Sequence, residues 1–192
     1  MIDRQMIINQ IRESADVKNT MIVTSVEDIE KAADMMVAAV QNGNKILWCG
    51  NGGSAADAQH MAAELMGGLR SHDRPAIQSI ALTTDTSFIT AWSNDTDYES
   101  IFSRQIEGLG SAGDILMAIS TSGNSRNVVK AVESCNEKGI TVIVLTGKTG
   151  GLLKDMGDVT ISIPSDDTQR IQEGHLLAEH ILCEMVEKSV TG

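Results

Sequence analysis

The chain has 192 residues, of which 42% are hydrophobic, and a formal net charge of −11. A chain of this length can bury enough surface for one compact domain, and we expect residues 1–192 to form a single domain. The acidic balance argues against a nucleic-acid partner or an acidic membrane surface, since both are bound mainly by clustered lysine and arginine.

Cysteine usage and apolar runs bear on the cellular location. The three cysteines, Cys49, Cys135 and Cys183, are odd in number and show no CxxC spacing, which is typical of reduced thiols. The first residues lack the pattern of a signal peptide. No apolar stretch approaches the roughly 18 residues of a membrane span. We therefore expect a cytoplasmic protein without membrane segments.

The first part of the chain predicts two helices. Apolar residues recur at a mostly helical period over 2–23. Ser25, followed by Asp28, has the spacing of a capping box and predicts a second helix that runs to about Val40 and is ended by Gly43. These helices are too apolar to lie as solvated arms. We expect the segment of about 2–42 to be covered in an oligomer.

Five short apolar runs follow, at 45–49, 77–82, 115–119, 141–145 and 159–163. They are apolar on both faces and alternate with helix-length segments, the last of which is at about 168–188. This pattern predicts an α/β fold with a parallel sheet covered by helices on both sides. Ligands of such sheets bind at the carboxyl ends of the strands. Two loops rich in glycine and serine lie at such ends.

The first loop, GNGGS at 50–54, precedes a predicted helix, so its backbone N–H groups would converge where an anion is favoured. It also fits a loose GxGxxA pattern of dinucleotide-binding proteins. That alternative is weak, because the carboxylate expected about 20 residues later is missing and Asp85 comes about 30 residues after the motif. A Walker loop is excluded, since no GKS or GKT follows either glycine cluster.

The second loop, STSGNS at 120–125, offers the hydroxyl groups of Ser120, Thr121, Ser122 and Ser125. Capping a helix and turning the chain would use one or two of these hydroxyls. The full set, next to a helix N-terminus, favours an anion site, and phosphate is the natural ligand. A phosphorylated small molecule gripped by both loops suits even an acidic protein, because backbone amides supply the attraction.

His60 and Glu64 share a face of the helix predicted after the first loop. Their spacing suits a shared metal ion or a proton-transfer pair, although such pairs also occur on solvated helix faces. In the last helix, Gln172 and His180 lie two turns apart on roughly one stripe. The four residues could meet around one ion.

The last helix also holds a competing pair. His175 and Glu179 have the same four-residue spacing as His60 and Glu64. We expect this pair at the surface or between subunits.

Six segments, in matching order and spacing, closely resemble the bacterial phosphoheptose isomerases, a family with the sugar isomerase (SIS) fold. The segments are CGNGGS at 49–54, QHMAAEL at 59–65, ND at 94–95, STSGNS at 120–125, LTGK at 145–148 and RIQE at 170–173 with His180. The resemblance implies a flavodoxin-like, three-layer αβα sandwich with a five-stranded parallel sheet and extra N-terminal helices. It also implies a homotetramer whose subunits complete each other's sites.

The activity that the resemblance implies is an aldose–ketose isomerase acting on sedoheptulose 7-phosphate, at the first step towards ADP-heptose and the lipopolysaccharide core. Matched by position, Glu64 is the base that moves a proton between C1 and C2, and His180 is the acid on the oxygens. The family's ligands for one zinc ion correspond to His60, Glu64, Gln172 and His180. The substrate contacts correspond to Asn51, Gly52, Gly53, Ser54, Glu64, Asn94, Asp95, Ser120, Thr121, Ser122, Ser125 and Gln172.

The chain departs from the family pattern at the edge of the pocket. Gln169 stands where some relatives carry an acidic residue, so a proton-relay role at that position is lost. The residues at 55–56 and 67–70 also differ. These departures leave the exact substrate preference open.

Two other functions remain as alternatives. One is a non-catalytic SIS protein that binds the replication initiator, whose loops resemble 54–56 and 123–126 of this chain. That protein lacks the carboxylate and the histidine found here at Glu64 and His180. The other is a regulatory sugar-phosphate sensor, which usually carries a fused DNA-binding segment.

Overall fold

The computed structural model describes residues 2–191, in which five parallel strands form one sheet. In chain order the strands are β1 (Ile46–Cys49), β2 (Ser79–Ala81), β3 (Ile115–Ser120), β4 (Thr141–Thr146) and β5 (Val159–Ser162). Their order across the sheet is β2-β1-β3-β4-β5. Every predicted strand is confirmed, with small shifts at the ends.

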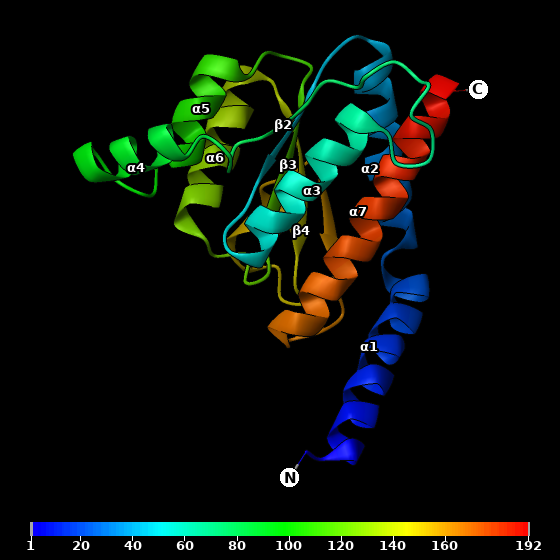
Figure 1. The fold of residues 1–192 in the computed structure, drawn as a ribbon. Helices are drawn as coiled ribbons and strands as arrows, with labels where there is room; N and C mark the ends of the chain where they lie inside the picture. The colour runs from blue at the N-terminus through cyan, green and yellow to red at the C-terminus, as the bar shows by residue number, and fades with distance from the viewer. Residues whose placement is uncertain (1, 192) are drawn as a thin grey trace.

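Helices cover both faces of the sheet, which confirms the three-layer αβα sandwich (Figure 1). One layer consists of α1 (Arg4–Thr24), α2 (Val26–Gln41), α3 (Gly53–Gly67) and α7 (Thr168–Thr191), and the other of α4 (Thr86–Asp95), α5 (Ile101–Leu109) and α6 (Arg126–Lys138). Side chains alternate along β1, so Ile46 and Trp48 join the core under α3 and α7, and Leu47 and Cys49 join the core under α5 and α6.

The topology places both glycine- and serine-rich loops at one point. From β1 the chain moves to the edge strand β2, and from β3 it moves the opposite way through β4 to β5. The neighbouring strands β1 and β3, paired with Ile46 opposite Ile115, therefore form the switch point of the sheet. The loops that follow these two strands lie at their carboxyl ends, where ligands of open α/β sheets bind.

The junction between α1 and α2 differs from the predicted capping box. Ser25 directly precedes α2, but its side chain makes no capping hydrogen bond. Its hydroxyl instead donates to the carbonyl oxygen of Ser162, at the end of β5, over 3.1 Å. Asp28 faces Lys31 at 3.9 Å. The capping box was therefore wrong, because burial of Ser25 against β5 turns its side chain away from the helix.

The helix α1 extends beyond the body of the sandwich (Figure 1). Its last turns leave Ile22 and Val23 exposed at 66% and 83%, whereas Met21 and Met36 are buried in the core. The expected oligomeric cover for the exposed residues stays a prediction. Among the described helices, α1 included, there is none whose length and apolar character would let it span a bilayer.

Candidate functional site

The loop between β1 and α3 presents the N-terminus of α3. Gly52 is the N-cap residue and has a φ of +57°, a conformation that side-chain-bearing residues rarely adopt. The N–H of Gly53 is among the first in the helix and has no intrahelical carbonyl to reach. A Cβ atom on Gly53 would lie 2.5 Å from the amide nitrogen of Gln172. Glycine here lets α7 approach the loop closely.

The loop between β3 and α6 gathers the predicted hydroxyls. Ser120 is buried at the end of β3, and its Oγ lies 3.0 Å from the Oγ of Ser125, the N-cap residue of α6. Gly123 has a φ of +65°, and a side chain there would collide with the carbonyl group of Gly150. The loop is therefore held against the segment that follows β4.

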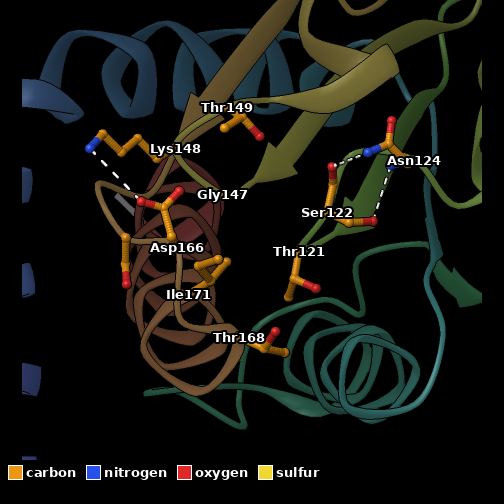
Figure 2. Close-up of a pocket in the computed structure, with 10 residues that line it drawn as sticks. Thr121, Ser122, Asn124, Gly147, Lys148, Thr149, Asp166, Thr168 and Ile171 are labelled. Carbon is orange, nitrogen blue, oxygen red and sulfur yellow. Dashed lines mark hydrogen bonds and ion pairs between the residues drawn. The ribbon is translucent and has the colours of Figure 1, made fainter.

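A cavity of about 240 Å³ opens between the β3–α6 loop, the segments that follow β4 and β5, and the start of α7 (Figure 2), and no residue of the β1–α3 loop is among its lining residues. Thr121, Ser122 and Asn124 line it from one side, and Lys148 lies on the side opposite. The Nζ atom of Lys148 is 3.9 Å from Asp166, in an exposed pair that can open at little cost. The remaining lining residues are Gly147, Thr149, Ser165, Thr168 and Ile171. Hydroxyl groups and one mobile ammonium group make this cavity suitable for a phosphate.

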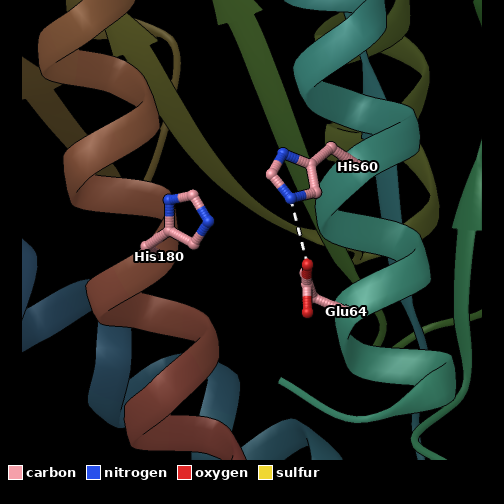
Figure 3. A group of neighbouring side chains, drawn as sticks. All are labelled: His60, Glu64 and His180. Atoms are coloured by element: carbon pink, nitrogen blue, oxygen red, sulfur yellow. Dashed lines mark hydrogen bonds and ion pairs between the residues drawn. The ribbon is translucent and has the colours of Figure 1, made fainter. Parts of the chain in front are cut away.

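Three side chains from two helices meet farther along α7 (Figure 3). His60 and Glu64 project from α3, with Nε2 of His60 and Oε1 of Glu64 3.0 Å apart. The ring of His180 meets the ring of His60 edge to face, with centroids 5.1 Å apart. One ligand atom from each of the three residues lies within 4.8 Å of the others. We call His60, Glu64 and His180 the histidine–glutamate cluster.

The chemistry of the cluster fits a zinc ion. Two imidazole nitrogens and one carboxylate are a donor set that zinc enzymes use while keeping a position open for water or substrate. The Nδ1 atom of His180 lies 2.9 Å from the carbonyl oxygen of Leu176. A carbonyl oxygen can accept a hydrogen bond but cannot donate one. Nδ1 is therefore protonated, and Nε2 of His180 is left with its lone pair for the cluster.

Gln172 lies near the start of α7, where α7 packs against the N-terminus of α3. Its amide packs against Gly53, and it precedes His180 by eight residues, or about 12 Å of helix. Its role as a fourth zinc ligand stays a prediction. In the present conformation Gln172 lies beside the loop, between the phosphate cavity and the histidine–glutamate cluster.

Asn94 and Asp95 lie at the end of α4 and are exposed. Their side chains form a hydrogen bond of 2.7 Å with each other. The cavity and the histidine–glutamate cluster, as described, do not include them. Their predicted contact with the sugar stays a prediction.

The expectation that His175 and Glu179 lie at the surface was wrong. Both side chains are fully buried within this chain, since the same face of α7 packs against α3 and the sheet. Burial lowers the pKa of His175 to about 4. Burial, with a contribution from the carboxylate of Asp57, raises the pKa of Glu179 to about 8. Helical spacing alone does not distinguish this buried pair from a solvated one.

Asp57 belongs to this region and was not predicted from the sequence. It lies one turn before His60 on α3, and burial raises its pKa while the imidazole groups of His60 and His180 oppose the rise. Its spacing of three residues from His60 was the available signal. Lys148 was also missed as a site residue, although it directly follows the glycine at the end of β4.

Comparisons with known proteins agree with this geometry. Residues 10–147 match the model of the SIS domain. A phosphoheptose isomerase of Sulfurimonas denitrificans is 48% identical over 191 residues, which cover 98% of this chain and 97% of that protein. The structure of a phosphoheptose isomerase from Francisella tularensis is 37% identical with a TM-score of 0.94, covering 98% of this chain and all of that one.

A second solved relative gives the same result. The phosphoheptose isomerase from Neisseria gonorrhoeae is 43% identical with a TM-score of 0.89, covering 95% of this chain and 98% of that one. Both the sequence and the fold are thus shared over nearly the whole length. The chain belongs to the SIS-domain family, in the branch of the phosphoheptose isomerases.

Proposed function

We propose that this protein isomerises sedoheptulose 7-phosphate to D-glycero-D-manno-heptose 7-phosphate. The observation that carries the proposal is the placement of a phosphate-sized cavity and a histidine–glutamate cluster along one helix, α7. About two and a half turns of α7 separate Ile171 at the cavity from His180. A substrate that uses both must have several carbons between its phosphate and its reacting carbonyl, as a heptose 7-phosphate has.

The reaction moves a proton between two neighbouring carbons. Glu64 takes the proton from C1 of the ketose, the electron pair of that C–H bond forms the C1–C2 double bond of an enediolate, and the π pair of the C2 carbonyl moves onto O2. Glu64 then returns the proton to C2, while His180 moves the hydroxyl proton from O1 to O2. In the described chain Glu64 Oε1 contacts His60, and no hydrogen bond occupies Oε2.

His60, Glu64 and His180 would hold the zinc ion, with Gln172 as the predicted fourth ligand. When bound, zinc would supply a Lewis acid that polarises the sugar carbonyl. The hydrogen bond of His180 to the backbone of Leu176 fixes the ring and leaves one lone pair, on Nε2, which serves either the zinc ion or the transfer of a proton at any one time.

We assign the contacts with the phosphate and the sugar to the two glycine- and serine-rich loops. Ser120, Thr121, Ser122 and Ser125 form the phosphate cradle, with Lys148 as an added cation. Gly52 and Gly53 offer backbone amides to the sugar. The exposed apolar residues of α1, such as Val23, are the surface on which we expect a homotetramer to form. We expect the enzyme to act in the cytoplasm, where it would catalyse the first step towards ADP-heptose.

The initiator-binding alternative is not favoured. A binding protein has no need for a carboxylate and an imidazole held within reach of each other, yet Glu64 and His180 lie in one cluster here. The named relatives reported above are phosphoheptose isomerases. A regulatory sensor of sugar phosphates would share the cavity but would not require the histidine–glutamate cluster.

The test is turnover of sedoheptulose 7-phosphate by purified protein of known metal content, followed by NMR in deuterated water with and without a chelator. We expect conversion with deuterium at C2, its loss on chelation and its return with added zinc. If metal-replete protein leaves the sugar unchanged but captures the replication initiator in a pull-down, the proposal is wrong.

A further inference from the structure

A single side chain, Asn51, connects the two loops of the site. Its Nδ2 donates to Oδ1 of Asn127 over 2.9 Å, and its Oδ1 accepts from Nδ2 of Asn127 over 2.8 Å. The hydroxyl of Tyr98 donates to the same Oδ1 over 2.8 Å. Asn51 lies in the β1–α3 loop, Asn127 in the first turn of α6 and Tyr98 between α4 and α5.

The orientation of both amide groups is set by the backbone. The N–H of Val128 donates to Oδ1 of Asn127 over 3.0 Å, and a backbone N–H can only donate. Oδ1 of Asn127 therefore faces Val128 and must receive Nδ2 of Asn51. Oδ1 of Asn51 is then the acceptor for both Asn127 and Tyr98. Asn127 is 3% exposed, so its bonds with Asn51 are shielded from water, whereas the bond from Tyr98 lies in an exposed position.

We propose that Asn127 and Tyr98 are positioning residues, which act through Asn51 to hold the β1–α3 and β3–α6 loops at the spacing where one sugar phosphate contacts both. This inference rests on the proposed function. Asn51 was predicted to contact the sugar, and one of the two hydrogens on its Nδ2 is left for that contact, whereas its Oδ1 accepts two hydrogen bonds within the protein. Its contribution to positioning is to tie the loop that carries the Gly52 and Gly53 amides to the first turn of α6.

Tyr98 connects a third segment, the chain between α4 and α5, to Asn51. It lies three residues after Asp95, the end of α4, a helix without a buried residue. Two half-buried side chains, Ile89 and Trp92, pack α4 against the core, and its far end also depends on the chain that follows it. The bond from Tyr98 to Asn51 holds the chain after Asn94 and Asp95 close to the ligand loops, where these two residues are predicted to contact the sugar.

The variants are Tyr98→Phe and Asn127→Asp. Tyr98 is 53% exposed, so loss of its hydroxyl removes one hydrogen bond and leaves the core intact. In Asn127→Asp one oxygen still accepts from Val128, but the other cannot donate to Asn51. Asn136→Asp is the matched control, because it makes the same change at an exposed position of α6.

We expect KM for sedoheptulose 7-phosphate to rise about fivefold in Tyr98→Phe and about tenfold in Asn127→Asp, with kcat within threefold of wild type. The control should match wild type. Because both residues act on Oδ1 of Asn51, the double variant should show less than the product of the two effects. A purely structural role would lower the melting temperature and leave KM unchanged.

Binding of inorganic phosphate, measured by calorimetry in the same variants, separates this inference from the proposed function. If wild type fails to turn over the sugar, the proposed function is wrong, and weaker phosphate binding in Tyr98→Phe and Asn127→Asp than in Asn136→Asp still supports loop positioning. Phosphate affinity and KM within twofold of wild type in both variants would overturn the inference.

Discussion

Arg74, in the segment between α3 and β2, and Glu187 of α7 form a buried ion pair that fastens the end of α3 to α7. Nε of Arg74 and Oε2 of Glu187 are 2.8 Å apart, with side chains 2% and 3% exposed. The carboxylate of Glu187 also accepts the backbone N–H groups of residues 69–71, and Arg74 donates to the carbonyl oxygen of Glu64 over 2.9 Å. This pair fixes the distance between the helices that carry Glu64 and His180.

Glu187→Gln should destabilise the fold. The change leaves the Arg74 guanidinium buried without its counter-charge, which costs about 3 kcal/mol or more. The measurement is urea unfolding at pH 7. Glu184→Gln is the control, because Glu184 pairs with Arg70 in a pair whose arginine is 72% exposed and such pairs contribute little. Equal loss of stability in both variants would contradict the assigned role of the buried pair.

The ion pair of Arg74 and Glu187 also predicts how the free energy of unfolding depends on pH at low pH. Burial alone would raise the pKa of Glu187, but hydrogen bonds from Arg74 and from the backbone of Leu69 and Arg70 outweigh it and lower the pKa to about 2. Because the folded pKa lies below the usual value, the contribution is present above pH 4.5 and is lost as the pH falls towards 2. Unfolding experiments should show this loss in wild type and not in Glu187→Gln.

His175 should act in a separate, higher pH window. Its folded pKa of about 4 lies below the value of about 6.5 for a free imidazole, so the unfolded chain takes up a proton first as the pH falls. His175 alone therefore lowers the free energy of unfolding by about 2 kcal/mol between pH 6.5 and 4.5, whereas Glu179, whose pKa is raised to about 8, raises it over the same range. The measured quantity is the difference between the two proteins, and the stability of wild type relative to His175→Gln should fall by about 2 kcal/mol over this range. An unchanged pH dependence in the variant would show that His175 is not the responsible group.

The sheet could be read from the sequence because its signals are local. Each strand is a short apolar run bounded by glycine, aspartate or serine, and parallel strands buried on both faces need no finer pattern. The order of the strands across the sheet did not follow from this pattern and is known from the structure. Ser25 is a case in which a local pattern was misleading. Its spacing from Asp28 predicts a helix cap, but its hydroxyl donates a hydrogen bond to the carbonyl oxygen of Ser162, which is distant in the sequence.

Candidate site residues could be predicted from the sequence where all of them lie in one loop or on one helix face. The hydroxyls of Thr121 and Ser122 and the pair His60 and Glu64 are such cases. Residues that act across elements gave no such signal. Burial of His175, the bond from Tyr98 to Asn51 and the place of Gln172 beside Gly53 all depend on packing between segments far apart in the chain.

Glu64→Gln should remove the catalytic base and leave the fold in place. An amide cannot take the proton from C1, and loss of general base catalysis lowers kcat by roughly 10²- to 10⁴-fold. The measurement is kcat for sedoheptulose 7-phosphate, together with the zinc content and melting temperature of the variant. Glu133→Gln, an exposed change on α6, is the control. Turnover within a few-fold of wild type would contradict the role of Glu64.

Thr121→Val tests the phosphate cavity with almost no change in shape. The valine keeps the volume of threonine and removes one hydroxyl from the cavity wall, and loss of one hydrogen bond to a charged group costs about 1.5–3 kcal/mol. We expect KM to rise by at least tenfold with a smaller effect on kcat, because phosphate contacts are made equally in substrate and transition state. Thr160→Val is the control: the hydroxyl of Thr160 donates to the carbonyl of Lys154, outside the cavity. If the two variants have the same KM, the phosphate binds elsewhere.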